Sequence, residues 1–158
     1  MQFSKQTLEF IKKECERYET RRSAIIPCLY KIQEEMGYIN VDAVKALAQV
    51  MDIPESKINE VLKFYTMFNQ NPVGKLHVQV CNNISCCMMG SRELTQHLLN
   101  TYKVDFDEIT PDGKFSFSSV ECLGSCDTAP MMQVNDKYYE NLTQAKIDQL
   151  IEEWRAAK

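Results

Sequence analysis

Four of the seven cysteines stand in two short pairs, and cysteine thiolates are ligands that bind iron and zinc. Four residues separate Cys81 from Cys86, three separate Cys122 from Cys126, and 35 residues lie between the pairs. This arrangement suits a cofactor held between two loops, because each loop then supplies two thiolates. Four thiolates fit either one [2Fe–2S] cluster, with two on each iron, or one tetrahedral zinc ion.

The spacing of the pairs does not separate zinc from iron–sulfur, because both spacings fall within the range that structural zinc sites use. Disulfides are disfavoured because the number of cysteines is odd. Charged residues also run through residues 1–20, which predicts neither a secretory signal nor a transit peptide. A thiol oxidoreductase is disfavoured because no C-x-x-C motif stands at a predicted helix start. We therefore expect a metal or cluster site in a reducing, cytoplasmic compartment.

Composition and charge argue against two broad classes of function. The chain has 158 residues, of which 44% are hydrophobic and 25% charged, as in a globular protein, and its longest apolar runs are too short to span a membrane. The net charge is −4: residues 1–70 carry ten basic and ten acidic side chains, and residues 71–158 carry eight and twelve. The acidic excess lies beside the cysteine pairs and does not attract a phosphate backbone. We therefore expect neither membrane insertion nor nucleic-acid binding.

Apolar residues recur at helical spacing through residues 1–70 and predict four helices joined by short turns. Ser4 is expected to cap the first helix, and Gly37 to close the second. Phe64 and Phe68 lie off the apolar stripe of the fourth helix. We predict them as core residues, with a contact to another domain or subunit as the alternative. Residues 1–70 therefore predict an N-terminal helical domain.

Residues 71–158 predict a second domain of mixed structure, and the polar, turn-rich run 69–75 marks the boundary. The predicted order is β-α-β-β-β-α, with strands at 76–80 and 115–120, a helix capped by Ser91, a hairpin over 131–139 and a last helix from Thr143. Each cysteine pair directly follows one of the first two strands, so neighbouring strands would bring both loops to one edge of the sheet. The predicted fold class is α+β, with a small mixed sheet and flanking helices.

Two runs around the cysteine pairs resemble a known family. VCNNISCCMMGS covers residues 80–91, and VECLGSCDTAP with the following MMQVNDKYYENLT covers residues 120–143. Both resemble the 24 kDa-type subunit of respiratory complex I, an NADH:quinone oxidoreductase, and its counterparts in NAD(P)-linked hydrogenases and formate dehydrogenases. In the helical half the resemblance extends to GYI at 37–39 and EVLKFYTMF at 60–68, so it covers most of the chain.

The resemblance implies a thioredoxin-like ferredoxin domain that holds one [2Fe–2S] cluster. Carried over residue by residue, the four ligands are Cys81, Cys86, Cys122 and Cys126. The implied function is an electron-transfer subunit that exchanges single electrons with a 51 kDa-type flavoprotein subunit, which binds FMN and NAD(H), in a larger oxidoreductase complex at the inner membrane. The chain itself has five glycines and no G-x-G-x-x-G or P-loop spacing. We therefore expect it to bind neither FMN nor NAD(H), and not to be catalytic alone.

Two other classes of function stay open at this point. A zinc-stabilised interaction module would use the same four thiolates only to hold the loops together. A DNA-binding regulator with a redox sensor is prompted by the short N-terminal helices, but the balanced charge of residues 1–70 provides no basic face. Metal and sulfide content tests the first class, and a gel shift at low salt tests the second.

The remaining cysteines, methionines and histidines are predicted to lie outside the ligand set. Cys87 directly follows Cys86 and is an inert neighbour, a substitute ligand or an oxidation-prone thiol. The residues predicted to pack rather than bind metal are Cys15, Cys28, Met88, Met89, Met131 and Met132. His77 and His97 fall in a predicted strand and a predicted helix, away from the cysteine loops.

Overall fold

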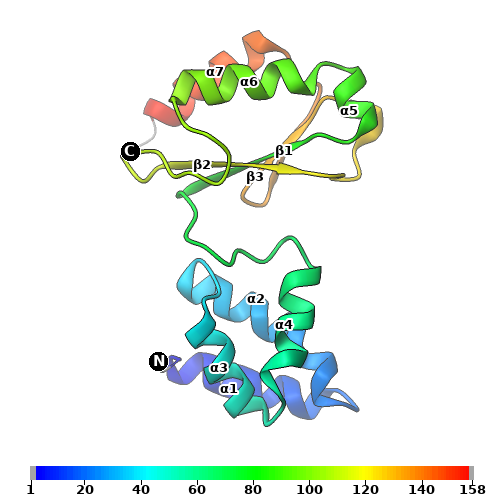
Figure 1. Ribbon diagram of the computed structural model, residues 1–158, viewed down its shortest axis with the longest axis vertical. Helices are drawn as coiled ribbons and strands as arrows, with labels where there is room; N and C mark the ends of the chain where they lie inside the picture. Colours follow the sequence, from blue (N-terminus) through cyan, green and yellow to red (C-terminus); the bar gives the residue numbers. More distant parts are fainter. Residues whose placement is uncertain (1–2, 157–158) are drawn as a thin grey trace. The chain divides into compact units, whose positions relative to one another are not determined.

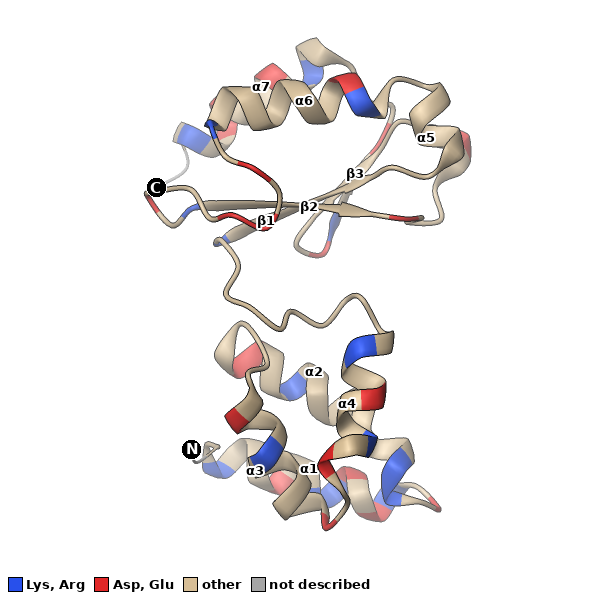
Figure 2. Ribbon diagram, viewed as in Figure 1, with Lys and Arg blue, Asp and Glu red and all other residues tan. Residues whose placement is uncertain are grey.

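The computed structural model describes residues 3–156 and divides the chain into two compact units (Figure 1). One unit spans Met1–Pro72 and the other Val73–Lys158. Each unit packs its own apolar core. Basic and acidic residues are interspersed along the described parts of both units (Figure 2).

The first unit is built from helices whose ends follow signals in the sequence. They are α1 Lys5–Arg17, α2 Ile25–Met36, α3 Val41–Met51 and α4 Glu55–Phe64, with a 3-10 turn, η1 Arg21–Ala24, before α2. Ser4 caps α1 by accepting a hydrogen bond from Thr7 N at 3.2 Å. Asn40 caps α3 in the same way, and Gly37 follows α2 as predicted. The helices predicted for residues 1–70 are therefore confirmed.

Apolar stripes of these helices meet in the core of the first unit, where Ile11 of α1 and Ile58 of α4 have no exposed surface. Phe68 is buried as predicted and packs edge to face against Tyr30, with ring centroids 5.1 Å apart. The prediction that Phe64 is a core residue is wrong. Its side chain is 76% exposed, because it lies on a face of α4 turned away from Ile58.

The second unit is a mixed sheet with α6 and α7 on one face (Figure 1). In the described residues the strand order is β2-β1-β3-β4, with β1 parallel to β2, β3 antiparallel to β1, and β3 paired with β4 as a hairpin. The elements are β1 Leu76–Cys81, α5 Ile84–Met88, α6 Ser91–Tyr102, β2 Phe115–Val120, a 3-10 turn η2 Cys126–Thr128, β3 Met132–Val134, β4 Lys137–Tyr139 and α7 Gln144–Ala156. The predicted α+β class and the order β-α-β-β-β-α are confirmed, with α5 as an addition.

The two faces of the sheet differ in polarity, as the alternation in β1 predicts. Val78 and Phe117 are register partners, and both are fully buried in the core shared with α6 and α7. On the other face, His77 Nδ1 lies 2.8 Å from Ser116 Oγ, and His77 Nε2 lies 3.2 Å from Ser118 Oγ. Burial lowers the pKa of His77, so this ring is neutral at pH 7.

Two local predictions in the second unit are wrong. Ser91 does not cap α6: Gly90 occupies the cap position with a φ of +92°, and Ser91 is the first helical residue. The buried Ser91 hydroxyl instead donates to Asn82 Oδ1 at 3.2 Å. Residues 84–88 form α5, where no helix was predicted. Over residues 3–156, no helix has both the length and the apolar character needed to cross a membrane.

Candidate metal centre

The two cysteine pairs lie at one edge of the sheet, where β1 and β2 end. These strands are parallel neighbours, and Cys81 at the end of β1 is the register partner of Val120 at the end of β2. Cys86 follows in α5, while Cys122 lies two residues beyond β2 and Cys126 begins η2. The structure thus brings the four predicted residues to one place, because parallel neighbouring strands end at the same edge.

Contacts within and between the two loops place the four thiols near one another. The Sγ atoms of Cys122 and Cys126 are 3.8 Å apart, and Cys81 Sγ donates to the Glu121 carbonyl at 3.1 Å, which ties the first loop to the second. The pKa of Cys86 is raised to about 11, first by burial, then by a hydrogen bond with Cys81 and by the nearby thiols of Cys81 and Cys126. Because ligating thiols must be deprotonated, metal binding at this site would release protons.

The geometry of the second thiol pair fits two thiolates on one metal ion. Two sulfur ligands at about 2.3 Å from one tetrahedral metal are roughly 3.8 Å apart, which is the distance between Cys122 Sγ and Cys126 Sγ. The Cys122–Cys126 pair therefore has the spacing of two thiolates on one metal ion, which suits a [2Fe–2S] cluster and a tetrahedral zinc ion alike.

The two pairs differ in their exposure to solvent. Cys81 and Cys86 are 2% and 1% exposed and pack with Met131. Cys122 and Cys126 are both exposed. A cofactor bound by all four would therefore have one side within the protein and one side toward solvent.

Hydrogen-bond donors approach the exposed pair from both loops. Gly124 N donates to Cys122 Sγ at 3.4 Å, from a backbone with a φ of +80° that favours glycine. The pKa of Cys126 is raised by a hydrogen bond with Cys122 and by repulsion from the negative charge of the Cys122 thiolate. A hydrogen bond from the Ser85 hydroxyl of α5 opposes this rise. Donors to sulfur stabilise thiolates and tune the potentials of iron–sulfur sites.

Cys87 and the two histidines lie outside this set. Cys87 Sγ donates to the Asn82 carbonyl at 3.1 Å, within the first loop. Its three predicted roles, as an inert neighbour, a substitute ligand or an oxidation-prone thiol, stay predictions. The His77 ring hydrogen-bonds with Ser116 and Ser118 on the sheet face opposite α6 and α7, and His97 Nε2 pairs with Asp148 Oδ1 at 2.5 Å. Both histidines therefore lie away from the cysteine loops, as predicted.

The methionines near the site fall into two groups. Met131 and Met132 are buried, as predicted. Met88 is 81% exposed and Met89 is exposed too, so the packing prediction is wrong for this pair, because α5 lies outside the core of the sheet. With Ile84 they form an exposed apolar surface on α5 and the residue that follows it, which sequence reasoning missed. The available signal was the presence of three large apolar residues in and directly after the first cysteine loop.

The fold and the thiol site define a class of protein: a small α+β ferredoxin-like protein with two cysteine loops at one edge of its sheet. Residues 11–155 match the model of the thioredoxin-like [2Fe-2S] ferredoxin family, and the chain belongs to that family. An NADH-quinone oxidoreductase subunit of Rhizobium meliloti is 43% identical over 150 residues, which cover 95% of this chain and 89% of the relative. NADH-quinone oxidoreductase subunit 2 of Thermus thermophilus is 39% identical over 153 residues, which cover 95% and 84%.

A solved structure shares this fold. The NAD+-reducing [NiFe]-hydrogenase in its air-oxidized state matches with a TM-score of 0.72 over 84% of this chain, at 23% sequence identity. The match spans 23% of that hydrogenase chain, so this chain corresponds to about a quarter of it. At this identity the likeness establishes the fold alone. The family resemblance predicted from the sequence is confirmed by the family model and the relatives.

Proposed function

We propose that this chain is an electron-transfer subunit that holds one [2Fe–2S] cluster on Cys81, Cys86, Cys122 and Cys126. One observation supports this proposal most strongly: two parallel neighbouring strands end at the same sheet edge, so that both thiol pairs lie there. Membership of the family supports the cluster as the cofactor. When bound, such a cluster accepts and donates one electron at a time.

The residues of the site have different roles in this proposal. Cys81 and Cys86 hold the cofactor from the side where the protein excludes water. Cys122 and Cys126 hold it from the exposed side, and electrons cross to a partner there. The Gly124 N–H group reduces the negative charge on the Cys122 thiolate, which favours reduction of the site.

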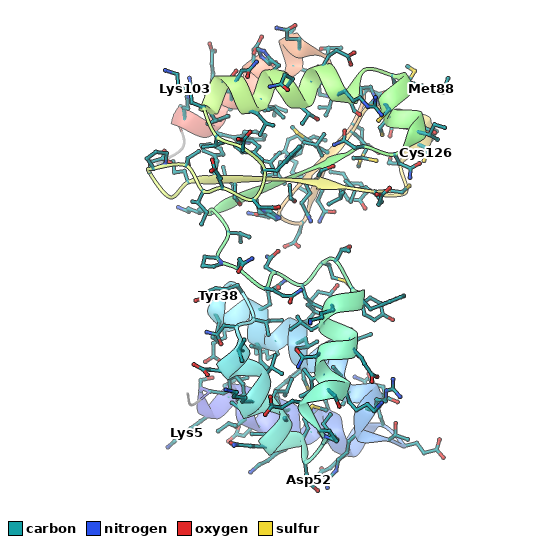
Figure 3. All side chains as sticks on the ribbon, in the orientation of Figure 1. Lys5, Tyr38, Asp52, Met88, Lys103 and Cys126 are labelled. Atoms are coloured by element: carbon teal, nitrogen blue, oxygen red, sulfur yellow. The ribbon has the colours of Figure 1, made fainter. Side chains whose placement is uncertain are left out.

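The proposed partner is a flavoprotein subunit that oxidises NADH at FMN, within a larger cytoplasmic complex at the inner membrane. Two relatives bear the names of NADH-quinone oxidoreductase subunits, which supports a parent of complex I type. The fold shared with an NAD+-reducing hydrogenase makes the equivalent hydrogenase subunit the alternative. The exposed apolar residues Ile84 and Met88 of α5, with Met89 directly after it, offer a contact surface. Met88 and Cys126 lie at the same end of the second unit (Figure 3).

Metal and sulfide analysis of the anaerobically purified chain tests the cofactor. We expect about two irons and two sulfides per chain, and a spin-one-half EPR signal after reduction with dithionite. One zinc ion per chain, with neither sulfide nor signal, would overturn the proposal and leave a zinc-stabilised interaction module.

A further inference from the structure

The loop that carries the exposed thiols is hydrogen-bonded to one carboxylate. Glu140 follows β4, and its Oε1 atom accepts a hydrogen bond from Thr128 Oγ1 at 2.8 Å and another from Ser125 Oγ. The two hydroxyl oxygens are themselves 2.7 Å apart. Ser125 directly precedes Cys126, and Thr128 ends η2, so Glu140 fixes both ends of the turn that presents Cys126.

Apolar packing contributes little to this turn, since none of the described residues of η2 is buried. The neighbouring segment 138–141 supplies further hydrogen bonds. Tyr138 OH donates to the Leu123 carbonyl at 2.9 Å, and Asn141 N donates to the Thr128 carbonyl at 2.7 Å. Residues 138–141 therefore form a clamp on the second cysteine loop, and Glu140 is the member that binds its side chains.

Glu140 carries a negative charge at neutral pH. Hydrogen bonds from the Ser125 hydroxyl and then from the Thr128 hydroxyl lower the pKa of its carboxyl group. By formal counting, a [2Fe–2S] site with four thiolates carries about two negative charges when oxidised and gains one more on reduction. A fixed anion beside the second loop therefore disfavours reduction of the site.

We propose that Glu140 is a positioning residue that holds the Cys126 turn in its ligating geometry and keeps the reduction potential of the site low. It acts through Ser125 and Thr128, because its hydrogen bonds with their hydroxyl groups fix the position of the turn that contains Cys126. The inference rests on the proposed function, and it adds a residue that neither the cysteine spacing nor the burial pattern indicates.

Two substitutions separate the parts of this proposal. Glu140→Gln keeps an oxygen that accepts both hydroxyl hydrogen bonds but removes the charge. We expect its reduction potential to rise, while the rate of cluster release stays near that of the wild type. Glu140→Ala removes charge and acceptor together. We expect a similar rise in potential and a release at least roughly tenfold faster, because alanine accepts neither hydroxyl hydrogen bond and the loss of one hydrogen bond to a charged group already corresponds to about a factor of ten.

EPR-monitored redox titration at low salt measures the potential, because salt screens the charge effect. Loss of visible absorbance in the presence of an iron chelator measures release. Glu152→Gln is the matched control, since it removes an exposed carboxylate from α7 of the same unit, and it should behave as wild type. The double variant Ser125→Ala/Thr128→Ala keeps the charge and removes the donors, so it should also release the cluster faster.

The outcomes separate the inference from the proposed function. Wild-type potential and release rate in both Glu140 variants, in a chain that binds the cluster, would overturn the inference and leave the proposed function intact. An equal shift in potential from Glu152→Gln would overturn the assignment of the charge effect to Glu140. A wild-type chain that binds no cluster would overturn the proposed function, and the inference with it.

Discussion

The two cysteine loops present identical ligand types but are stabilised in different ways. In the first loop, Cys81 ends a central strand and Cys86 lies in a helix, and both side chains are buried. In the second loop, Cys122 and Cys126 are exposed, and the backbone between them is held by the clamp of residues 138–141. The sequence spacing of the cysteines therefore indicates which residues can bind a metal, while the packing around each loop determines how strongly that loop is stabilised.

The energetics of the two loops differ accordingly. A buried thiol behaves as a small apolar group and gains stability from its contacts, here with Met131 and Ala129. The second loop depends on hydrogen bonds, and a typical one contributes only about 0.5–1.5 kcal/mol net. We therefore expect the first loop to keep its structure in the cluster-free chain, and the second to loosen.

Replacing one cysteine of each pair with serine gives the largest expected contrast. Cys86→Ser places a hydroxyl in a buried apolar site, so the cluster-free chain should lose about 1–3 kcal/mol of unfolding free energy. Cys126→Ser changes an exposed side chain and should leave the cluster-free chain as stable as the wild type. Both variants should bind less iron. Urea unfolding of the cluster-free chains and iron analysis of the loaded chains measure these effects.

A control variant distinguishes burial from ligation in this experiment. Cys28→Ser buries a hydroxyl in the core of the first unit, so it should destabilise the chain while iron content stays at the wild-type level. Equal losses of stability in Cys86→Ser and Cys126→Ser would contradict the difference between the loops. Full iron content in either variant would remove that cysteine from the ligand set.

Much of the fold was predictable because local sequence patterns, such as alternation, helix caps and turn residues, specify it. Alternation predicted a strand at 76–80 that leads directly into Cys81, and the Ser4 cap predicted the start of α1; the observed β1 and α1 agree with both predictions. The hairpin predicted over 131–139 turns at Asn135, which adopts the positive φ that asparagine tolerates. These signals lie within a few residues of the feature they specify. The domain boundary at 70/71 and the four-cysteine ligand set stay predictions.

Two of the misses, at Phe64 and Glu140, depend on contacts between residues apart in the sequence, and the third is a short helix. The helix face that bears Phe64 is buried only if another element packs against it. The burial of Phe64 therefore could not be predicted from periodicity alone. The five-residue helix α5 is too short to show a period. Glu140 meets Ser125 across fifteen residues of turn and hairpin, and a glutamate after a strand carries no signal of such a contact.

The exposed apolar surface of α5 gives the next largest expected effect, and it belongs to the first loop alone. Met88→Ser combined with Met89→Ser should slow electron exchange with a flavoprotein subunit about tenfold, if about 1.4 kcal/mol of apolar contact is lost at the interface. Iron content and stability should not change, because both side chains are exposed. Rapid mixing of the reduced chain with the flavoprotein measures the rate. Ile109→Ser, an exposed apolar site beside the start of β2, is the control, and an equal slowing there would contradict a specific surface.

The smallest expected effect concerns the hydrogen bond at the edge of the clamp, which Tyr138 OH donates to the Leu123 carbonyl. Tyr138 is 46% exposed, so water replaces the lost donor, and Tyr138→Phe should cost about 0.5 kcal/mol. Because Leu123 precedes Gly124, the cost should concentrate in the second loop. The Gly124 amide, which donates to Cys122 Sγ, should exchange its hydrogen about twofold faster in the cluster-free chain.

Tyr30→Phe is the matched control for this measurement, since Tyr30 is 48% exposed and lies in the first unit. It should leave exchange at Gly124 unchanged, and exchange at Cys86 in the first loop should be unchanged in both variants. Equal exchange at Gly124 in all three chains would mean that the Tyr138 contact does not hold the backbone of the second loop. The two loops would then differ in exposure but not in what orders them, and cluster ligation itself would have to bring Cys122 and Cys126 into place.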